Sequence, residues 1–227
     1  MKKVIYYFIL LLTIICFFTG CSGETNETIR SQCADSLEAL QNNPSSHTTE
    51  TITLSFPDGE IIQEITRWYM DGDCLYECVQ AGSVQFRYLQ YEDTFYENFD
   101  GTEIWTTSET HINIEPSHLS WDTSVNNIIS WNKTSDEIQV VCNNLPSETM
   151  KTGIMVYTNS IITYYFDTQW NLKAYEVKSD LTVEEGTADD YSMSMTVAVT
   201  FHSTQDTQIR TSIDDVYSQV MQGQSKK

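Results

Sequence analysis

The chain has 227 residues, with 12 lysines and arginines against 32 aspartates and glutamates, a formal net charge of −20 at pH 7. A surface this acidic repels phosphate backbones and anionic headgroups, which argues against nucleic acid as a partner. The length suits one sizeable core, and no cluster of Lys and Arg interrupts the acidic character.

The first twenty residues have the composition of an export signal. Met1-Lys2-Lys3 is positively charged, and residues 4–18 carry no charged side chain. A basic start followed by an apolar run marks a secretory signal. The run is shorter than the roughly 18 to 20 residues of a comfortable membrane span. An ordinary cleaved signal and an uncleaved anchor helix remain open alternatives to a lipoprotein signal.

The segment Phe18-Thr19-Gly20-Cys21-Ser22 resembles the lipobox of bacterial lipoproteins, although Phe18 stands where Leu is usual. The resemblance implies a signal peptide over residues 1–20, lipidation of Cys21 by acyl chains such as palmitate, and a lipidated tether over residues 21–26. Two acyl chains suffice for stable attachment. We therefore expect a lipid-anchored protein on the extracytoplasmic, cell-surface side of a bacterial membrane.

Four of the six cysteines follow Cys21, and an exported chain permits disulfides between them. Each lies in an apolar pattern, where a free thiol packs as a small hydrophobe, so buried thiols and one cross-bridge both remain open. Two of them, four residues apart on one strand and about 13 Å from each other, cannot bridge. The four are Cys33, Cys74, Cys78 and Cys142.

No metal site is expected, because no histidine falls near a cysteine pair as a zinc site would need. The histidines are His47, His111, His118 and His202. The pair Asp71 and Asp73 flanks Gly72 without the further oxygens of a calcium loop, so it indicates a hairpin turn.

The first half of the sequence predicts one helix and then a meander of strands. Apolar residues recur at three- and four-residue steps over residues 27–41, which is typical of an amphipathic helix. The period then changes to two, and Asp-Gly dipeptides at 58–59, 71–72 and 100–101 predict tight hairpins. Consecutive strands joined this way are antiparallel neighbours. We expect them over residues 51–56, 60–70, 73–79, 84–91, 94–99 and 103–106.

The second half predicts a short central helix, further strands and a closing helix. The helices are expected over residues 122–131 and 206–221, and the strands over residues 138–143, 154–158, 161–166, 172–183 and 191–201. A sheet this wide should curl. We predict an α+β fold, a single domain over residues 27–222 followed by a polar tail at 223–227. It is a large curved antiparallel β-sheet, or half-barrel, with N-terminal, central and C-terminal helices against its apolar face.

Two strands carry the residues expected to bind a ligand. One face of the strand at 191–201 is apolar and flexible, and the strand at 84–91 offers two aromatic residues on one face. The candidate ligand-binding residues are Met193, Met195, Val197, Val199, Phe201, Phe86 and Tyr88.

The order of elements resembles the LolA/LolB/LppX-like lipoproteins and carriers. The stretch at 164–173 also looks like the late hairpin of their Gram-positive relatives, with Asn171 near a usual glycine, since Asn tolerates left-handed backbone. The resemblance implies a half-barrel that holds acyl chains or other apolar ligands.

The sequence offers no recognisable catalytic machinery. It has no nucleophile elbow, no His-Glu-x-x-His and no phosphate-binding glycine loop, so we expect no catalytic residues, no cofactor and no enzyme. We expect binding of an apolar or amphipathic small ligand, such as a lipid, between sheet and helices. The alternative is a cell-surface module without a cavity that binds a protein, a glycan or a peptide through its aromatic side chains. Any envelope protein partner is unidentified.

Overall fold

The computed structural model describes residues 25–41, 45–70, 74–99, 101–102, 104–108, 128–143, 150–152, 155–183 and 191–224. The predicted signal peptide and Cys21 lie outside these residues. The elements are α2 (Asn26–Gln41), β1 (Ser46–Phe56), β2 (Gly59–Met70), β3 (Cys74–Ala81), β4 (Val84–Tyr91), β5 (Thr94–Phe99), β6 (Thr106–Ser108), β7 (Ile128–Lys133), β8 (Ile138–Asn143), β9 (Met150–Thr152), β10 (Met155–Phe166), β11 (Leu172–Val183), β12 (Tyr191–Phe201) and α4 (Asp206–Gln224). Neither α2 nor α4, the helices of this described part, is long and apolar enough to cross a membrane.

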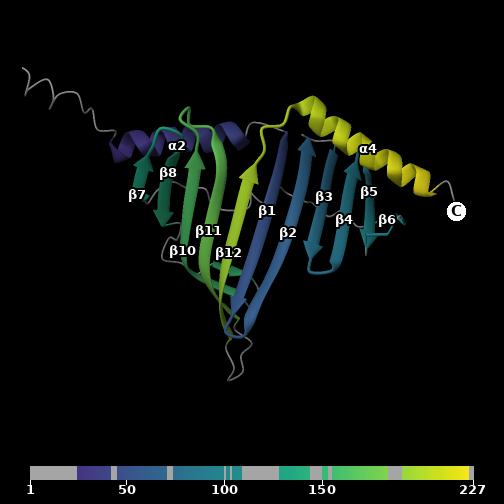
Figure 1. Cartoon of the computed structure of the whole chain (residues 1–227), viewed down its shortest axis with the longest axis horizontal. Helices are drawn as coiled ribbons and strands as arrows, with labels where there is room; N and C mark the ends of the chain where they lie inside the picture. Colours follow the sequence, from purple (N-terminus) through teal and green to yellow (C-terminus); the bar gives the residue numbers. More distant parts are fainter. Residues whose placement is uncertain are drawn as a thin grey trace, which may run out of the picture.

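All twelve strands belong to one antiparallel sheet, with the order β6-β5-β4-β3-β2-β1-β12-β11-β10-β8-β7 and with β9 paired to β10 (Figure 1). The first and last strands are neighbours at its centre, where Thr48 lies opposite Phe201 and Ser55 opposite Ser194. This pairing joins two meanders, β1–β6 and β7–β12. The predicted large antiparallel sheet is confirmed; its half-barrel curvature stays a prediction.

The hairpin between β10 and β11 is fixed by a single aspartate. The carboxylate of Asp167 accepts hydrogen bonds from the backbone of Gln169 at 2.8 Å and of Asn171 at 2.9 Å, and from the Asn171 side chain at 2.8 Å. The Asn171 side chain and these backbone donors lower the pKa of Asp167. The left-handed residue of the turn is Trp170, with φ of 68°, one position before the expected Asn171.

The two helices pack on opposite faces of the sheet. Residues paired across antiparallel strands share a face, and Val197 lies opposite Ile52 of β1, whereas Trp68 lies opposite His47 of β1. Positions 47 and 52 are five residues apart on one strand, so their side chains point to opposite faces. We call the face that carries Val197 the α2 face and the face that carries Trp68 the α4 face.

Helix α2 covers the α2 face over the strands of the second meander. Its three buried residues, Ile29, Cys33 and Leu37, are spaced four apart and form one stripe. They share a core with buried side chains of β8, β10, β11 and β12, which are Ile138, Val140, Cys142, Ile162, Tyr164, Phe166, Tyr175, Val177, Met195, Val197 and Val199.

Helix α4 covers the α4 face over the strands of the first meander. Its buried residues Ile209, Ile213 and Val220 share a core with Cys74, Tyr76, Leu89, Tyr96 and Trp105. Each group of strands is therefore covered by the helix from the opposite end of the chain: the N-terminal helix packs on the C-terminal strands, and the C-terminal helix packs on the N-terminal strands.

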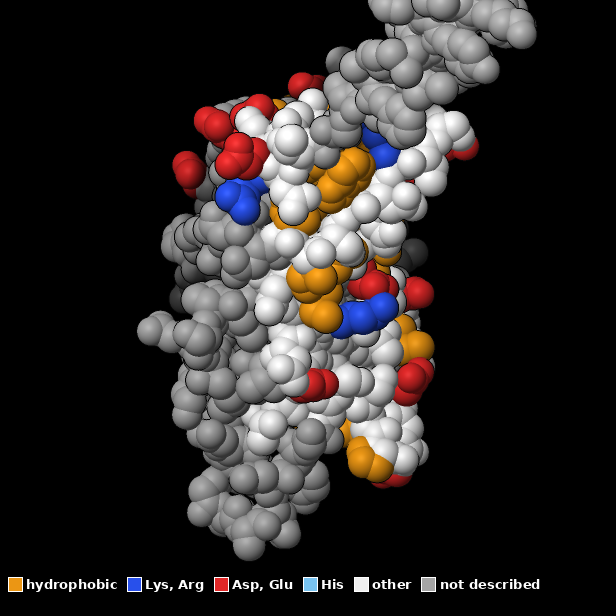
Figure 2. Space-filling view, turned by 90° about the vertical axis from the view of Figure 1, so that its left-hand side faces the viewer, with side chains coloured by type: hydrophobic (Ala, Val, Ile, Leu, Met, Phe, Trp, Pro, Cys, Tyr) orange, Lys and Arg blue, Asp and Glu red, His pale blue; other side chains and the backbone are white. Residues whose placement is uncertain are grey.

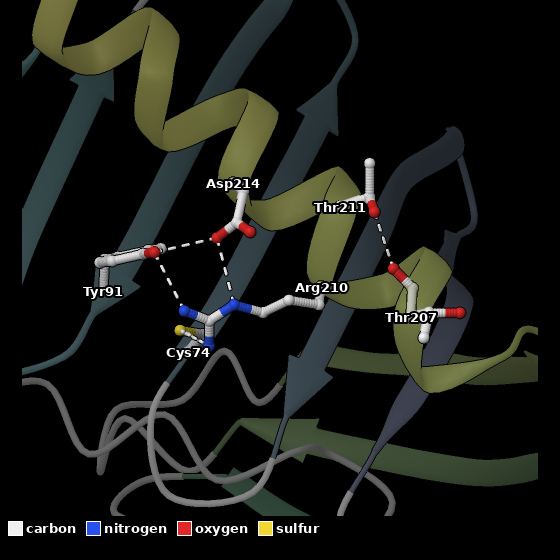
Figure 3. Close-up of polar contacts among 6 residues, drawn as sticks. All are labelled: Cys74, Tyr91, Thr207, Arg210, Thr211 and Asp214. Carbon is white, nitrogen blue, oxygen red and sulfur yellow. Dashed lines mark hydrogen bonds and ion pairs between the residues drawn. The ribbon is translucent and has the colours of Figure 1, made fainter.

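Polar contacts hold α4 to β3 and β4 (Figure 3). Arg210 donates to the hydroxyl of Tyr91 at 3.0 Å and to the sulfur of Cys74 at 3.5 Å, and pairs with Asp214 at 3.2 Å. Tyr91 in turn donates to Asp214 at 2.9 Å. The Tyr91 ring stacks on Tyr217, with centroids 4.0 Å apart. These contacts set the position of the helix along the sheet.

The structure corrects several expectations. Residues 128–131 of the expected central helix belong to β7, because Trp131 pairs with Val140 of β8; residues 122–127 lie outside the described part. The strand expected at 103–106 is instead the short β6, and β9 was not expected. The prediction that all helices lie against one face is wrong for α4, because both faces of this sheet carry an apolar area.

The side of the molecule at β7 shows how the charge is distributed (Figure 2). Several acidic side chains gather toward the top of this view and others are scattered below, while the few basic side chains stand singly, some of them beside acidic ones. Ile129 of β7 and Ile161 of β10 are exposed. Among the described residues drawn in this view, the basic side chains form no continuous patch.

Candidate functional site

The predicted ligand-binding face of β12 lies beneath α2. Met195, Val197 and Val199 are buried in the α2 core, and Phe201 packs partly buried against it. Met193 lies farther along β12 and is half-buried. These residues contact α2 and neighbouring strands, so most of the predicted β12 lining forms packed core.

The two predicted residues of β4 share the α2 face with β12 but lie far across the sheet. The pairing runs from Val199 through Glu50, Ile65 and Val79 to Phe86. Four strand spacings amount to roughly 19 Å. The seven candidate residues thus share one face but form two separate groups. Their role as ligand contacts stays a prediction.

A buried charge cluster occupies the α2 face between these two groups. Arg67 of β2 pairs with Glu50 of β1 and with Glu77 of β3. Side-chain exposure is 11% for Arg67 and 4% for Glu50. Burial would lower the pKa of Arg67, but Glu77 and Glu50 together raise it. Burial and the carboxylates of Glu97 and Glu77 also raise the pKa of the adjacent Tyr88.

A pocket of about 310 Å³ opens where the C-terminal half of α2 meets the ends of β1, β11 and β12. Its lining is half apolar and half polar, and it includes Phe201, one of the seven predicted residues. The lining residues are Ser36, Ala39, Leu40, Ser45, Ser46, His47, Asn171, Leu172, Phe201, His202, Ser203 and Thr204. The apolar face beneath α2 therefore continues, through Phe201, into an open space.

The polar side of α2 beside this pocket has one unsatisfied acceptor. Ser36, which lines the pocket, donates to the backbone oxygen of Trp170. One turn earlier, the side-chain oxygen of Gln32 is buried and accepts no hydrogen bond from the described part of the chain. A buried acceptor without a donor costs free energy, on the order of 1–3 kcal/mol.

Two histidines meet at the same pocket. His202 follows β12 and donates its backbone N–H to the oxygen of His47 at 2.9 Å, which continues the β1–β12 ladder by one pair. Their rings lie with centroids 4.4 Å apart and planes tilted by 33°. Burial and the nearby His202 lower the pKa of His47. Sequence reasoning missed this pair, because only the pairing of the first strand with the last brings positions 47 and 202 together.

A second pocket of about 340 Å³ lies at the far end of α4, lined by Arg87, Trp105 and Gln219 among others. Its one cation is already engaged: Arg87 donates to Asn98 at 2.9 and 3.0 Å and lies 5.1 Å from the centre of the Trp105 ring. Trp105 joins this pocket to the α4 core, and the rest of its lining is polar or glycine.

The described residues offer no group of three or more His, Cys, Asp or Glu side chains arranged to hold a metal. No disulfide joins any two of the four cysteines Cys33, Cys74, Cys78 and Cys142. The buried-thiol interpretation agrees with the structure for Cys33, Cys74 and Cys142, whereas Cys78 is half-buried.

No protein-family model matches the sequence, and no curated protein matches it. Among solved structures, a LolA superfamily protein from Nitrosomonas europaea is 6% identical with a TM-score of 0.30, over 78% of this chain and 94% of that chain. An outer membrane lipoprotein-sorting protein domain from Vibrio parahaemolyticus is 10% identical with a TM-score of 0.28, over 80% of this chain and 98% of that chain. Both names match the family that the sequence resembles, but superpositions this loose do not establish membership.

Proposed function

We propose that this domain binds an apolar or amphipathic ligand, in the first instance a lipid, in the pocket at the C-terminal end of α2, and that it performs no chemistry. One observation carries the proposal: the apolar face roofed by α2 runs through Phe201 into an open pocket. The space of about 310 Å³ lies near the lower end of the roughly 300–1,000 Å³ usual for small-molecule sites.

The lining suits a ligand with an apolar part and a polar part. Leu40, Leu172 and Phe201 supply apolar surface, while hydroxyl groups surround them. The buried oxygen of Gln32 would accept a hydrogen bond from a ligand that enters beneath the helix. A bound hydroxyl or amide donor there would remove the cost of the unsatisfied acceptor.

The predicted anchor supports a lipid over a water-soluble ligand. Lipidation of Cys21 would hold α2, which begins at Asn26, within a few residues of the membrane surface. The pocket at the other end of that helix would then lie about 25 Å from Asn26, because α2 has 16 residues at a rise of about 1.5 Å each.

The test compares two alanines of α2. Ala39 lines the pocket, whereas Ala34 is exposed on the same helix outside it. We expect Ala39→Trp to fill the pocket and to weaken binding of a fluorescent fatty acid at least tenfold. Ala34→Trp has the same helix propensity cost and should leave the affinity unchanged. Equal affinities in both variants would contradict the assignment of the pocket.

A second experiment addresses the ligand itself. Protein purified from its own host is extracted with organic solvent, and the extract is analysed by mass spectrometry. Lipid in stoichiometric amount, absent from Ala39→Trp, is the expected result. Protein that carries no lipid and takes up no fatty acid would favour the interaction module without a cavity, since the buried β12 residues already form a packed core.

A further inference from the structure

The histidine pair has a geometry that the apolar-ligand proposal does not use. His47 lies in β1 and His202 directly follows β12; the two residues are opposite each other and share the α4 face with Trp68. The backbone of His47 is held on both sides, by its pairing with Trp68 of β2 and by the hydrogen bond from His202. The His47 ring lies between its neighbours, 4.4 Å from His202 and 5.3 Å from Trp68, measured between ring centroids.

Each imidazole has one nitrogen held by a threonine hydroxyl. His47 Nδ1 lies 3.1 Å from Thr204 Oγ1, and His202 Nε2 lies 3.1 Å from Thr49 Oγ1. The other nitrogen of each ring, Nε2 of His47 and Nδ1 of His202, forms no hydrogen bond with the described residues. Histidines that bind metals have this arrangement, with one nitrogen on the metal and the other on an orienting partner.

The ring separation is close to that of two imidazoles on one metal ion. With metal–nitrogen bonds of about 2.0–2.1 Å and an angle near 90° to 110°, the ring centroids lie roughly 4.5–5.2 Å apart. The observed 4.4 Å needs a shift of only a few tenths of an ångström. Ring rotations within one rotamer supply such a shift without moving the backbone.

The surroundings favour a cation with incomplete protein ligation. Ser45, Ser46 and Ser203 line the adjoining pocket, where water bound to a metal would find hydrogen-bond partners. The net charge of −20 raises the local concentration of cations.

We propose that His47 and His202 together bind a late first-row divalent metal ion such as Zn²⁺, with water in the remaining positions. Imidazole nitrogens suit zinc, copper and nickel, whereas calcium and magnesium prefer oxygen. The site holds two protein ligands, so it is an open site, unlike the closed four-ligand sites that zinc uses for structure. The proposal is independent of lipid binding, although both use the same pocket.

The test is a calorimetric titration of the purified full-length protein with Zn²⁺ alone, without fatty acid. We expect one site per chain, weakened at least tenfold in His47→Gln and in His202→Gln. Glutamine retains a hydrogen-bonding side chain, and circular dichroism checks that each variant is folded. Thr49→Val keeps both imidazoles but removes the hydroxyl behind His202, and it should weaken binding about tenfold.

The controls are the two other histidines, His111 and His118, which lie outside the described part of the chain. Their glutamine variants should bind Zn²⁺ as the parent does. With Cu²⁺ as the probe, electron paramagnetic resonance should show two equatorial nitrogens, reduced to one in either His47→Gln or His202→Gln. Unchanged zinc affinity in both of these variants, or an equal loss in His111→Gln, would overturn the proposal. Either result leaves the lipid proposal standing, since that is measured with fatty acid and Ala39→Trp.

Discussion

Replacement of Arg67 by methionine tests how the buried charge cluster of the α2 face is held. Arg67 bridges the carboxylates of Glu50 and Glu77 across three adjacent strands. Methionine fills a similar volume without charge, so Arg67→Met leaves two carboxylates close together and shielded from water. The change removes only the cation, and the sheet register around it stays intact.

The magnitude follows from burial. Side-chain exposure is 11% for Arg67, 4% for Glu50 and 11% for Glu77, so solvent screens the cluster little. Breaking a buried ion pair by removing one partner costs about 3–5 kcal/mol, much of it the penalty for the unpaired charge. A domain of this size loses roughly 2–4 °C of melting temperature per kcal/mol. We therefore expect Arg67→Met to melt roughly 6–20 °C below the parent.

The assay is thermal unfolding followed by circular dichroism, supported by urea unfolding. The informative comparison is the triple variant Arg67→Met, Glu50→Gln and Glu77→Gln. It removes the charges as well as the pairing and should recover most of the loss, because its polar groups are cheaper to bury than unpaired carboxylates. The melting temperature of Arg67→Lys should lie between those of the parent and of Arg67→Met, since one ammonium cannot contact both carboxylates as a guanidinium does.

Two outcomes would refute the reasoning. A loss below about 1 kcal/mol in Arg67→Met would mean that water reaches the carboxylates and that the cluster behaves as a surface ion pair. A triple variant as unstable as Arg67→Met would mean that Arg67 acts through the packing of its alkyl chain.

Three further predictions concern the anchor, the thiols and the histidine pair. A clickable fatty acid should label the parent but not Cys21→Ser; equal labelling would remove the lipoprotein assignment. The thiols of Cys33 and Cys142 should react with a chromogenic thiol reagent only after the protein unfolds. Burial raises the pKa of Cys142 to about 11 and that of Cys33 still further, so neither thiol ionises readily in the native state. Rapid reaction of the native protein would contradict their burial. Because the pKa of His47 is lowered in the folded protein, the unfolded chain binds a proton at this residue more readily than the folded one does. The free energy of unfolding should therefore fall as the pH drops below about 6.5, the usual pKa of histidine. It should level off at the pH where His47 of the folded protein is protonated too. In His47→Gln, a stability curve between pH 7 and 5 as steep as that of the parent would exclude this group as the cause.

The local features of the fold were predictable from the sequence, because hairpins and strands are encoded by neighbouring residues. The strands at 84–91, 94–99, 138–143, 172–183 and 191–201 have the predicted bounds. Turn dipeptides fix where a strand ends, and two-residue alternation fixes which side chains share a face. That Val199 and Phe86 share a face depends also on the pairing of β1 with β12, because the two residues are linked only through β1, β2 and β3.

Non-local features were not predictable in the same way. The amphipathic stripe of α4, with Ile209, Ile213 and Val220, shows that the helix covers something apolar, but it does not say which face of a sheet it covers. In β3 the buried run Cys74, Leu75 and Tyr76 reflects coverage on both faces, a pattern that masks alternation. The candidate site depends on the β1–β12 pairing, so the sequence alone could not predict that its two histidines are neighbours.

The crossed placement of the helices has a consequence for how the chain reaches its native state. Strands β1–β6 are synthesised early, but α4, the helix that covers their aromatic residues, is the last element to be synthesised. Helix α2 is synthesised first, but the apolar face on which it packs forms only after β10–β12 have been synthesised. Neither meander can complete its core alone, so we expect one cooperative unfolding transition and slow folding governed by contacts between distant residues. A chain that stops before α4 would leave Tyr76, Leu89 and Tyr96 uncovered and open to proteolysis.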